Sequence, residues 1–260
     1  MTAINATTDP AFAPVIENRS AKGRIVLVCE HASNSFPLPW GDLGLTEAQR
    51  HAHIAWDPGA LGLMRGLARR LDAASIHAPV SRLIYDCNRA PDMPAAMPTR
   101  SEVHDIPGNA AITPTERANR TAALYVPFHA ALHGLIAERL ALGLAPAIIT
   151  IHSFTPIYFS QPRRVEFGVI HDADPGLALA IMAASDTCGL ITGLNAPYSA
   201  ADDVTHTLRL QATPYALPNA MLEIRNDLIA TPAEQEAMAD CLAPILLQAL
   251  TTTETSRKAG

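Results

Sequence analysis

The chain has 260 residues, long enough for one large α/β domain with a sizeable buried core. Hydrophobic residues make up 48% of the sequence and charged residues 17%, so the composition excludes an intrinsically disordered protein. The net charge of −6, without a basic tract, argues against a nucleic-acid partner, and the lack of a run of about 18 apolar residues argues against a membrane span.

Strands and helices alternate in the first half of the chain. The expected elements are a strand over 25–30, a helix opening at Thr46–Glu47, an amphipathic helix over 59–73, a strand over 75–80, a strand running into a loop over 81–91, and a long loop over 90–112. Long loops without periodicity are uncommon unless they serve a binding site, so we expect residues 90–112 to border one.

The second half continues this alternation. Its expected elements are a helix over 115–142, strands over 147–152 and 165–170, a helix over 175–187, a strand over 190–194, a loop to 217, a strand over 219–224 and a helix over 232–250. Thr113-Pro114 and Thr231-Pro232 are typical helix starts, because proline suits the first helical turn.

The alternation predicts a three-layer α/β sandwich around a mixed, mostly parallel sheet. No repeat or linker divides the chain. We therefore expect one domain over 23–250, preceded by an N-terminal extension over 1–22 and followed by a frayed tail over 251–260.

Two buried strands deliver a histidine to their carboxyl ends. The apolar run IVLVCEH ends at His31, and PAIITIHSF carries His152 near its end. In open α/β sheets, ligands gather outside the carboxyl ends of the strands, so we expect both imidazoles at one crevice as metal ligands. This hypothesis requires their ring nitrogens to lie within about 5 Å of each other, because zinc–nitrogen bonds are about 2.0–2.1 Å long.

A carboxylate is needed to complete such a site. Asp57, in HIAWDPGA, is the candidate third ligand, although an Asp before a helix can equally be an N-cap. Glu30 is a weaker candidate, since neighbours on a strand point to opposite faces and both can ligate only if the strand is broken. Two histidines and one carboxylate suit zinc, with other first-row metals as alternatives.

Glu223 is the candidate catalytic base. It lies on the apolar strand NAMLEIRND, where burial would raise its pKa, and Arg225 follows on the same face. The alternative is a structural salt bridge between Glu223 and Arg225.

The segment SRLIYDCNR supplies groups that suit a substrate carboxylate. Arg89 and Asn88, at its end, are the better candidates, because a guanidinium fork matches a carboxylate. Arg82 is a further candidate, and its pairing with Asp86 is the structural alternative.

Three other residues are weaker candidates. His129 and His133 have the i, i+4 spacing of a helical metal site, but no HExxH glutamate accompanies them. His133 fits the polar edge of a helix, whereas His129 can reach the crevice. Ser33 and Ser153 follow the strand-end histidines, yet neither has the glycines of a nucleophile elbow.

At these residues the chain resembles the N-formylglutamate amidohydrolase family. The matching strings are CEHASNSFP, LGL, HIAWDPGA, SRLIYDCNRAP, IPGN, IHSFTP, PYSA and LPNAMLEIRNDLI, in the family's order over about residues 25 to 230. Two positions depart from the family pattern: Gln211 stands where members often have His, and Arg164-Val165 replaces Pro-Trp. We expect both departures on loops at the crevice.

The resemblance implies a phosphorylase/hydrolase-like fold related to the zinc carboxypeptidases. It implies hydrolysis of N-formyl-L-glutamate to glutamate and formate, at the end of histidine breakdown. His31 and His152 would be metal ligands, Glu223 the carboxylate that activates water, and the arginines of SRLIYDCNR the partners of the substrate carboxylate. We add Arg225, Arg163 and Asn109 to this substrate-binding set.

The sequence thus predicts a zinc-dependent amidohydrolase for a small N-acyl amino acid. The alternatives are the same chemistry on another N-acyl amino acid, and a non-catalytic protein that binds small carboxylates. The first 22 residues lack the apolar core of a signal peptide, and the four isolated cysteines are expected to be reduced thiols. We therefore expect a cytoplasmic protein that is a monomer or a small homo-oligomer.

Overall fold

A seven-stranded sheet forms the centre of the molecule. The computed structural model describes residues 12–259, with side chains through residue 255. The strands lie in the spatial order β1 (Val15–Glu17), β3 (Ala74–His77), β2 (Ile25–Cys29), β6 (Ala147–Phe154), β11 (Asn219–Arg225), β9 (Phe167–Ile170) and β10 (Thr192–Leu194).

The sheet is mixed and mostly parallel, as the sequence predicted. β3, β2, β6 and β11 run parallel to one another, whereas β1 pairs antiparallel with β3. β9 pairs antiparallel with β11, and β10 runs parallel to β9. The carboxyl ends of the four central strands therefore meet at one edge.

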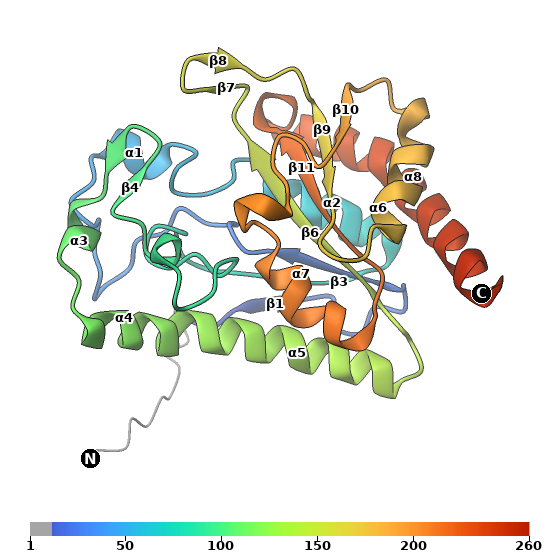
Figure 1. Cartoon of the computed structure of the whole chain (residues 1–260), viewed down its shortest axis with the longest axis horizontal. Coiled ribbons are helices and arrows are strands. Elements are labelled where there is room, and N and C mark those ends of the chain that lie inside the picture. The colour runs from blue at the N-terminus through green and yellow to red at the C-terminus, as the bar shows by residue number, and fades with distance from the viewer. Residues whose placement is uncertain (1–11, 260) are drawn as a thin grey trace.

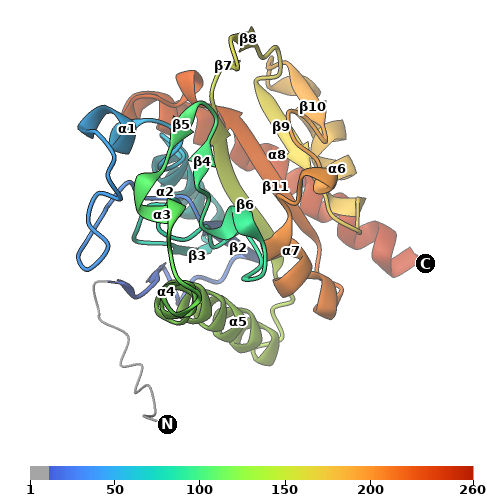
Figure 2. The same ribbon diagram turned by 60° about the vertical axis from the view of Figure 1, so that its left-hand side comes forward.

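Helices cover both faces of this sheet and complete three layers. On one face lie α2 (Ala60–Leu71), α6 (Gly176–Ala184) and α8 (Pro232–Ala259), which pack on residues such as Leu27, Ile149 and Leu222. The other face carries α5 (Val126–Ala141) and α7 (His206–Gln211). Figures 1 and 2 show α5 and α8 on opposite sides of the sheet.

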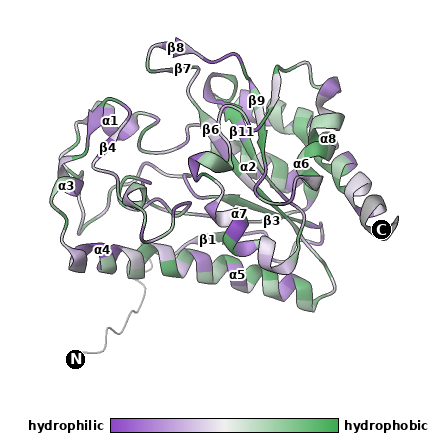
Figure 3. Cartoon of the chain, in the orientation of Figure 1, coloured by the Kyte–Doolittle hydropathy of each residue, from purple (hydrophilic) through white to green (hydrophobic). Residues whose placement is uncertain are grey.

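The central strands are apolar along their whole length because both of their faces are covered. Every residue of β2 is buried: Leu27 faces the layer of α2, α6 and α8, and Val28 faces the layer of α5. In Figure 3, β11 in the interior is mainly hydrophobic, whereas α1 (Glu47–His51) at the periphery is mainly hydrophilic. In the described part of the chain, no helix combines the length and hydrophobicity needed to cross a bilayer.

The long helix predicted over 115–142 forms as one continuous rod with a local defect. Thr113 caps α4 (Pro114–Arg120), a π-helical turn follows over Thr121–Tyr125, and α5 completes the rod. Pro127 has no N–H to donate within the helix, and the wider turn lies immediately before it.

Several short elements surround the carboxyl edge of the sheet. They are α1, a 3-10 turn η2 (Pro94–Ala96), the hairpin of β4 (Arg100–Ser101) and β5 (His104–Asp105), α3 (Pro107–Ala110), and the hairpin of β7 (Ile157–Tyr158) and β8 (Gln161–Pro162). The backbone N–H of Phe159 donates to Glu102 Oε1 at 3.3 Å, which joins the two hairpins.

The strand predicted at the start of 81–91 is wrong. This segment is irregular, and its apolar residues Leu83, Ile84 and Tyr85 are buried against the α5 layer. Its backbone pairs with other loops, for example Arg82 N with Ala55 O at 3.2 Å. The outer edge of β3 is already occupied by β1, so no strand position is open there.

Three further boundaries differ from the sequence prediction. Residues 15–17 of the expected N-terminal extension form the edge strand β1, and the expected loop before residue 217 contains α7. The expected frayed tail is helical as far as Ala259, where threonine hydroxyls such as that of Thr253 donate to the carbonyl four residues earlier.

Candidate metal and active site

The two strand-end histidines meet across neighbouring strands. His31 follows β2 by two residues, and His152 lies in β6, which pairs with β2 in parallel. Their Nδ1 atoms are 3.2 Å apart, although the residues are 121 positions apart in the sequence. Both side chains are buried. The distance lies well within the limit that a shared metal ion requires.

Asp57 joins the two imidazoles. Its Oδ2 atom lies 2.9 Å from His152 Nδ1 and 3.3 Å from His31 Nδ1. The turn before α2 brings it there, since Asp57 N donates to His31 O at 2.9 Å. Gly59 permits this turn with a φ of +82°, in the region that favours glycine.

The three atoms fit the coordination shell of a small metal ion. Ligands at about 2.0–2.1 Å from a tetrahedral zinc ion lie about 3.3 Å from one another, close to the observed separations. His31, Asp57 and His152 are the group of metal-ligating side chains that the described residues bring together. Two histidines and a carboxylate also leave a coordination position open for water or substrate.

The buried charges favour a cation at this place. Glu30, Asp57, Asp86 and Glu223 are all buried carboxyl groups. Two guanidinium groups lie near them: Arg82 pairs with Asp57 and Asp86, and Arg89 lies 3.9 Å from Asp86. Burial raises the pKa of Asp57, but the charge on His31 and hydrogen bonds from both histidines outweigh burial and lower it. Buried carboxylates are costly unless cations balance them.

The outer ring nitrogens also face carboxylates. His31 Nε2 lies 2.7 Å from Asp86 Oδ1, and His152 Nε2 lies 3.2 Å from Glu30 Oε2. Glu30 therefore contacts the side of His152 that faces away from Asp57. Burial lowers the pKa of His152, but the nearby carboxylates of Glu30 and Asp57 raise it well above its ordinary value.

Glu223 lies beside His152 on the next strand. The register of β11 on β6 pairs the two residues directly. Glu223 is buried, and its Oε2 atom has no hydrogen-bond partner among the described residues. Burial raises its pKa to about 7; the charge on His152 opposes this rise and Asp57 adds to it. Such a carboxylate can accept a proton near neutral pH.

These groups line a cavity of about 630 Å³ at the carboxyl edge of the sheet. The predicted residues on its wall are His31, Asp57, Arg82, Asn88, Arg89, His152, Ser153, Arg163 and Glu223. Residues of the long loop also line it, including Arg100 and Glu102, as expected for a loop at a binding site.

Arg163 is the arginine best placed to receive an anion. Its guanidinium lies 4.3 Å from the ring centre of Tyr158, 4.9 Å from that of Tyr198 and 5.5 Å from that of Phe154. Its Nη1 atom is buried without a hydrogen-bond partner in the described part of the chain. The aromatic rings hold the guanidinium in place at the cavity wall.

Arg82, Arg89, Asn88 and Ser153, also on the wall, already form hydrogen bonds or ion pairs within the protein. Arg82 contacts Asp86 at 2.8 Å and Asp57 at 3.3 Å. Arg89 donates to Asp202 O at 2.9 Å, and Asn88 accepts from Thr207 N at 2.9 Å. The hydroxyl of Ser153 donates to Pro58 O at 2.8 Å, so it is not poised as a nucleophile.

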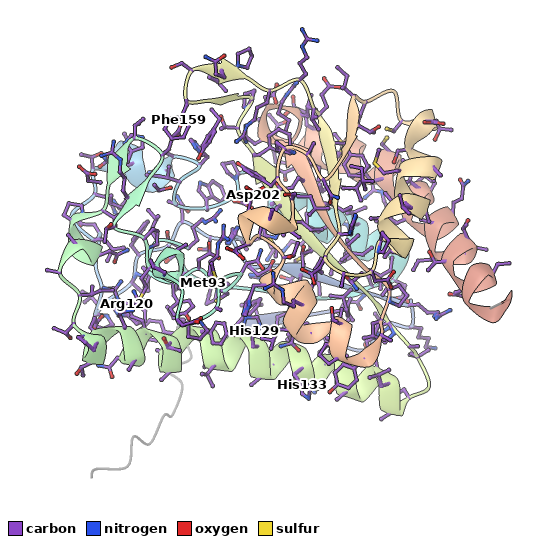
Figure 4. The ribbon with its side chains drawn as sticks, viewed as in Figure 1. Met93, Arg120, His129, His133, Phe159 and Asp202 are labelled. Carbon is purple, nitrogen blue, oxygen red and sulfur yellow. The ribbon has the colours of Figure 1, made fainter. Side chains whose placement is uncertain are left out.

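Five of the predicted residues do not lie on the cavity wall, and one of them is Glu30, which contacts His152 Nε2. Arg225 forms salt bridges with Asp227 and Glu166, and the described residues show none between Arg225 and Glu223, which was the structural alternative for Glu223. Asn109 accepts from the buried Arg120 at 2.8 Å. Ser33 accepts from Ser35 N at 3.0 Å. His129 donates to Cys87 O at 2.8 Å; in Figure 4 it points from α5 into the molecule, whereas His133 lies on the outer side.

Gln211, one of the two departures from the family pattern, does not lie on a loop at the crevice as expected. Gln211 is buried on α7, where its amide donates to His129 Nδ1 at 3.3 Å and to His129 O at 3.2 Å. It is not on the cavity wall. Arg164-Val165, in contrast, directly follows Arg163.

Sequence reasoning missed the aromatic partners of Arg163. Phe154 and Tyr198 lie in the strings IHSFTP and PYSA, which carry the family resemblance, so a signal was present. Their common contact with one guanidinium depends on the fold, because Phe154 ends β6, Arg163 follows β8, and Tyr198 comes from a distant loop.

Known proteins share both the sequence pattern and the fold. The family model for N-formylglutamate amidohydrolase matches residues 23–230. The crystal structure of gene product Atu2144 from Agrobacterium tumefaciens is 48% identical, with a TM-score of 0.92 over 94% of this chain and 96% of that one. The N-formylglutamate amidohydrolase from Ralstonia eutropha JMP134 is 19% identical, with a TM-score of 0.64 over 95% and 99% of the two chains. No match was found among curated proteins.

The fold and the site define an α/β protein whose buried His-Asp-His cluster can hold a metal ion. The chain belongs to the N-formylglutamate amidohydrolase family, because the family model covers most of its length. This membership supports an amidohydrolase activity.

Proposed function

We propose that this chain is a zinc-dependent amidohydrolase that cleaves N-formyl-L-glutamate, or a similar N-acyl acidic amino acid, to the amino acid and formate or another carboxylate. The observation that carries the proposal is the triangle of His31, Asp57 and His152 beside Glu223, whose Oε2 atom has no hydrogen-bond partner among the described residues. Such a reaction would complete histidine breakdown, in a cytoplasm that suits the four free thiols.

The metal would be held by His31, Asp57 and His152. A zinc ion bound there would polarise the acyl oxygen and lower the pKa of water. Glu223 takes a proton from the attacking water and passes it to the leaving amine, which frees the amino group as the C–N bond breaks. The pKa of about 7 suits both proton transfers.

Arg163 binds a carboxylate of the substrate. Its Nη1 atom makes no hydrogen bond to the part of the chain that the structure describes, and the guanidinium is fixed between aromatic rings. Both features favour an acidic amino acid over a neutral one. Arg89 is the second candidate, because it lies on the same wall and its Nε atom is 3.9 Å from Asp86 Oδ2, beyond hydrogen-bond distance.

The proposal is tested with purified protein and a panel of substrates. We expect about one zinc ion per chain, and faster hydrolysis of N-formylglutamate than of its acetyl and succinyl analogues or of neutral formyl amino acids. Equal rates on the acyl analogues would favour another N-acyl amino acid. No bound metal, together with unchanged carboxylate binding after His31→Ala, would favour a non-catalytic binding protein.

A further inference from the structure

Arg82 lies on the wall of the cavity, yet its contacts are those of a group that supports metal ligands. We propose that Arg82 and Asp86 are positioning residues that orient His31 and Asp57 toward the metal ion, and that Arg82 does not receive the substrate carboxylate. This inference rests on the proposed metal-dependent function and adds to it a division of roles among the arginines.

Asp86 fixes the ring of His31. Asp86 Oδ1 accepts from His31 Nε2 at 2.7 Å and from Asn88 N at 2.9 Å. A neutral imidazole that donates from Nε2 keeps its lone pair on Nδ1. His31 Nδ1 is the atom that faces Asp57 Oδ2 and His152 Nδ1. Asp86 thus selects the form of His31 that can bind a cation.

Arg82 connects this pair to the third ligand. Its Nη2 atom donates to Asp86 Oδ2 at 2.8 Å, and its Nη1 atom donates to Asp57 Oδ1 at 3.3 Å. Asp57 therefore uses one oxygen for Arg82 and presents the other, Oδ2, to the two histidines. The rigid guanidinium fork sets the two carboxylates relative to each other.

The same contacts leave Arg82 poorly suited to a substrate carboxylate. Both of its terminal nitrogens already face buried carboxylates, whose side chains are each 4% exposed. A third carboxylate at this guanidinium would meet two like charges. Arg163 has the opposite arrangement, because its partners are aromatic rings and its Nη1 atom is unpaired among the described residues.

The test separates metal affinity from substrate affinity in Arg82→Gln and Asp86→Ala. Arg70→Gln is the matched control. Arg70 also pairs with two carboxylates, those of Glu236 and Asp240, and its side chain is 23% exposed, against 27% for Arg82. It joins α2 to α8 and does not lie on the cavity wall. Zinc affinity is measured by competition with a chromophoric chelator, and KM is measured at saturating zinc.

We expect Arg82→Gln and Asp86→Ala to weaken zinc binding by about 10–100-fold, the usual effect of removing an outer partner of a ligand. KM at saturating zinc should stay near the wild-type value, and Arg70→Gln should leave zinc affinity unchanged. Unchanged zinc affinity with a raised KM in Arg82→Gln would overturn the proposal, and so would an equal loss of affinity in Arg70→Gln. If wild-type protein binds no zinc, the proposed function itself fails.

A second readout does not depend on catalysis or on the more disruptive variants. In zinc-loaded protein with ¹⁵N-labelled histidine, His31 should show a protonated Nε2 whose hydrogen exchanges slowly with water. Asp86→Asn and Arg82→Lys should speed that exchange, whereas Arg70→Lys should not. A His31 that binds zinc through Nε2 would contradict the assigned roles.

Discussion

Glu223 combines a pKa close to neutrality with a side-chain oxygen that has no partner among the described residues. We expect Glu223→Gln to lower turnover by about 10²–10⁴-fold, the usual contribution of a general base. Zinc content should not change, since Glu223 is not part of the ligand triangle. Near-normal turnover with full zinc content would remove Glu223 from the mechanism.

Arg163 is the residue on which acidic-substrate selectivity should depend. A charge-assisted hydrogen bond is worth about 1.5–3 kcal/mol, so we expect Arg163→Met to raise KM for N-formylglutamate by about 10–100-fold. The neighbouring exposed residue provides the control, since Arg164→Met should leave KM unchanged. An equal rise in KM for a neutral formyl amino acid, which keeps only the α-carboxylate, would show that Arg163 does not bind the side-chain carboxylate.

Individual residues differ in how far the sequence could predict them. His31 follows an apolar strand, and His152 and Glu223 lie near the carboxyl ends of two others, so their place at one sheet edge could be inferred. Asp57 lies at the turn before a helix. Arginines gave no such guidance. Only their partners distinguish Arg82, Arg163 and Arg225: Arg82 pairs with two carboxylates at the site, Arg163 contacts aromatic rings, and Arg225 pairs with acids away from the cavity wall.

At the scale of elements, the contact between α5 and α7 should make stability depend on pH. Burial lowers the pKa of His129 to about 4, the charge on His206 adds to this effect, and the hydrogen bond to Cys87 O opposes it. The unfolded chain, with an ordinary histidine pKa of about 6.5, binds more protons between these values. The stabilisation from neutral His129 is therefore complete above pH 6.5 and is lost as pH falls to 4.

We expect the free energy of unfolding to fall by about 2–3 kcal/mol between pH 7 and pH 4.5 through this histidine. The figure follows because each unit of difference between the folded and unfolded pKa is worth about 1.36 kcal/mol. The measurement is urea unfolding of wild type and His129→Gln at pH 7 and pH 4.5. Glutamine has no titrating group, so the advantage of wild type over the variant should shrink by that amount at the lower pH. A constant difference would show that His129 does not carry this pH dependence.

The start of α2 should be sensitive to an added methyl group. A Cβ at Gly59 would lie 2.2 Å from Ile229 O, and the φ of +82° is unfavourable for alanine. We expect Gly59→Ala to lower the free energy of unfolding by about 2–4 kcal/mol. Gly134→Ala is the control: it lies in α5 with no atom within 4 Å of the new Cβ, and should stabilise by about 0.5–1 kcal/mol.

The segment 81–91 shows why an apolar run does not by itself predict a strand, since this run is irregular in the structure. Its hydrophobic residues are buried, as the composition indicated, but they reach the core from a loop that crosses the carboxyl edge of the sheet. Burial alone selects apolar residues in a strand and in a covered loop alike. The position of β1 on β3 then leaves that edge without a place for another strand.

For the whole molecule, metal binding should contribute to stability. If zinc binds only the folded state, a free zinc concentration 100 times the Kd should raise the free energy of unfolding by about 2.7 kcal/mol. The measurement is chemical unfolding with zinc and with a chelator. His31→Ala should abolish this zinc dependence, because it removes one corner of the triangle. A zinc effect of the same size in His31→Ala would place the metal elsewhere.

The sequence by itself determined the layered α/β class, most of the strands and helices, and the delivery of two histidines to one edge of the sheet. These features depend on local periodicity and on the rule that parallel strands end together, both of which operate over short stretches. Only the tertiary structure decided which charged groups are paired, which stay available, and that α7 brings Gln211 to His129. The contact between Gln211 and His129 joins residues 82 positions apart, and packing, rather than any sequence spacing, sets such distances.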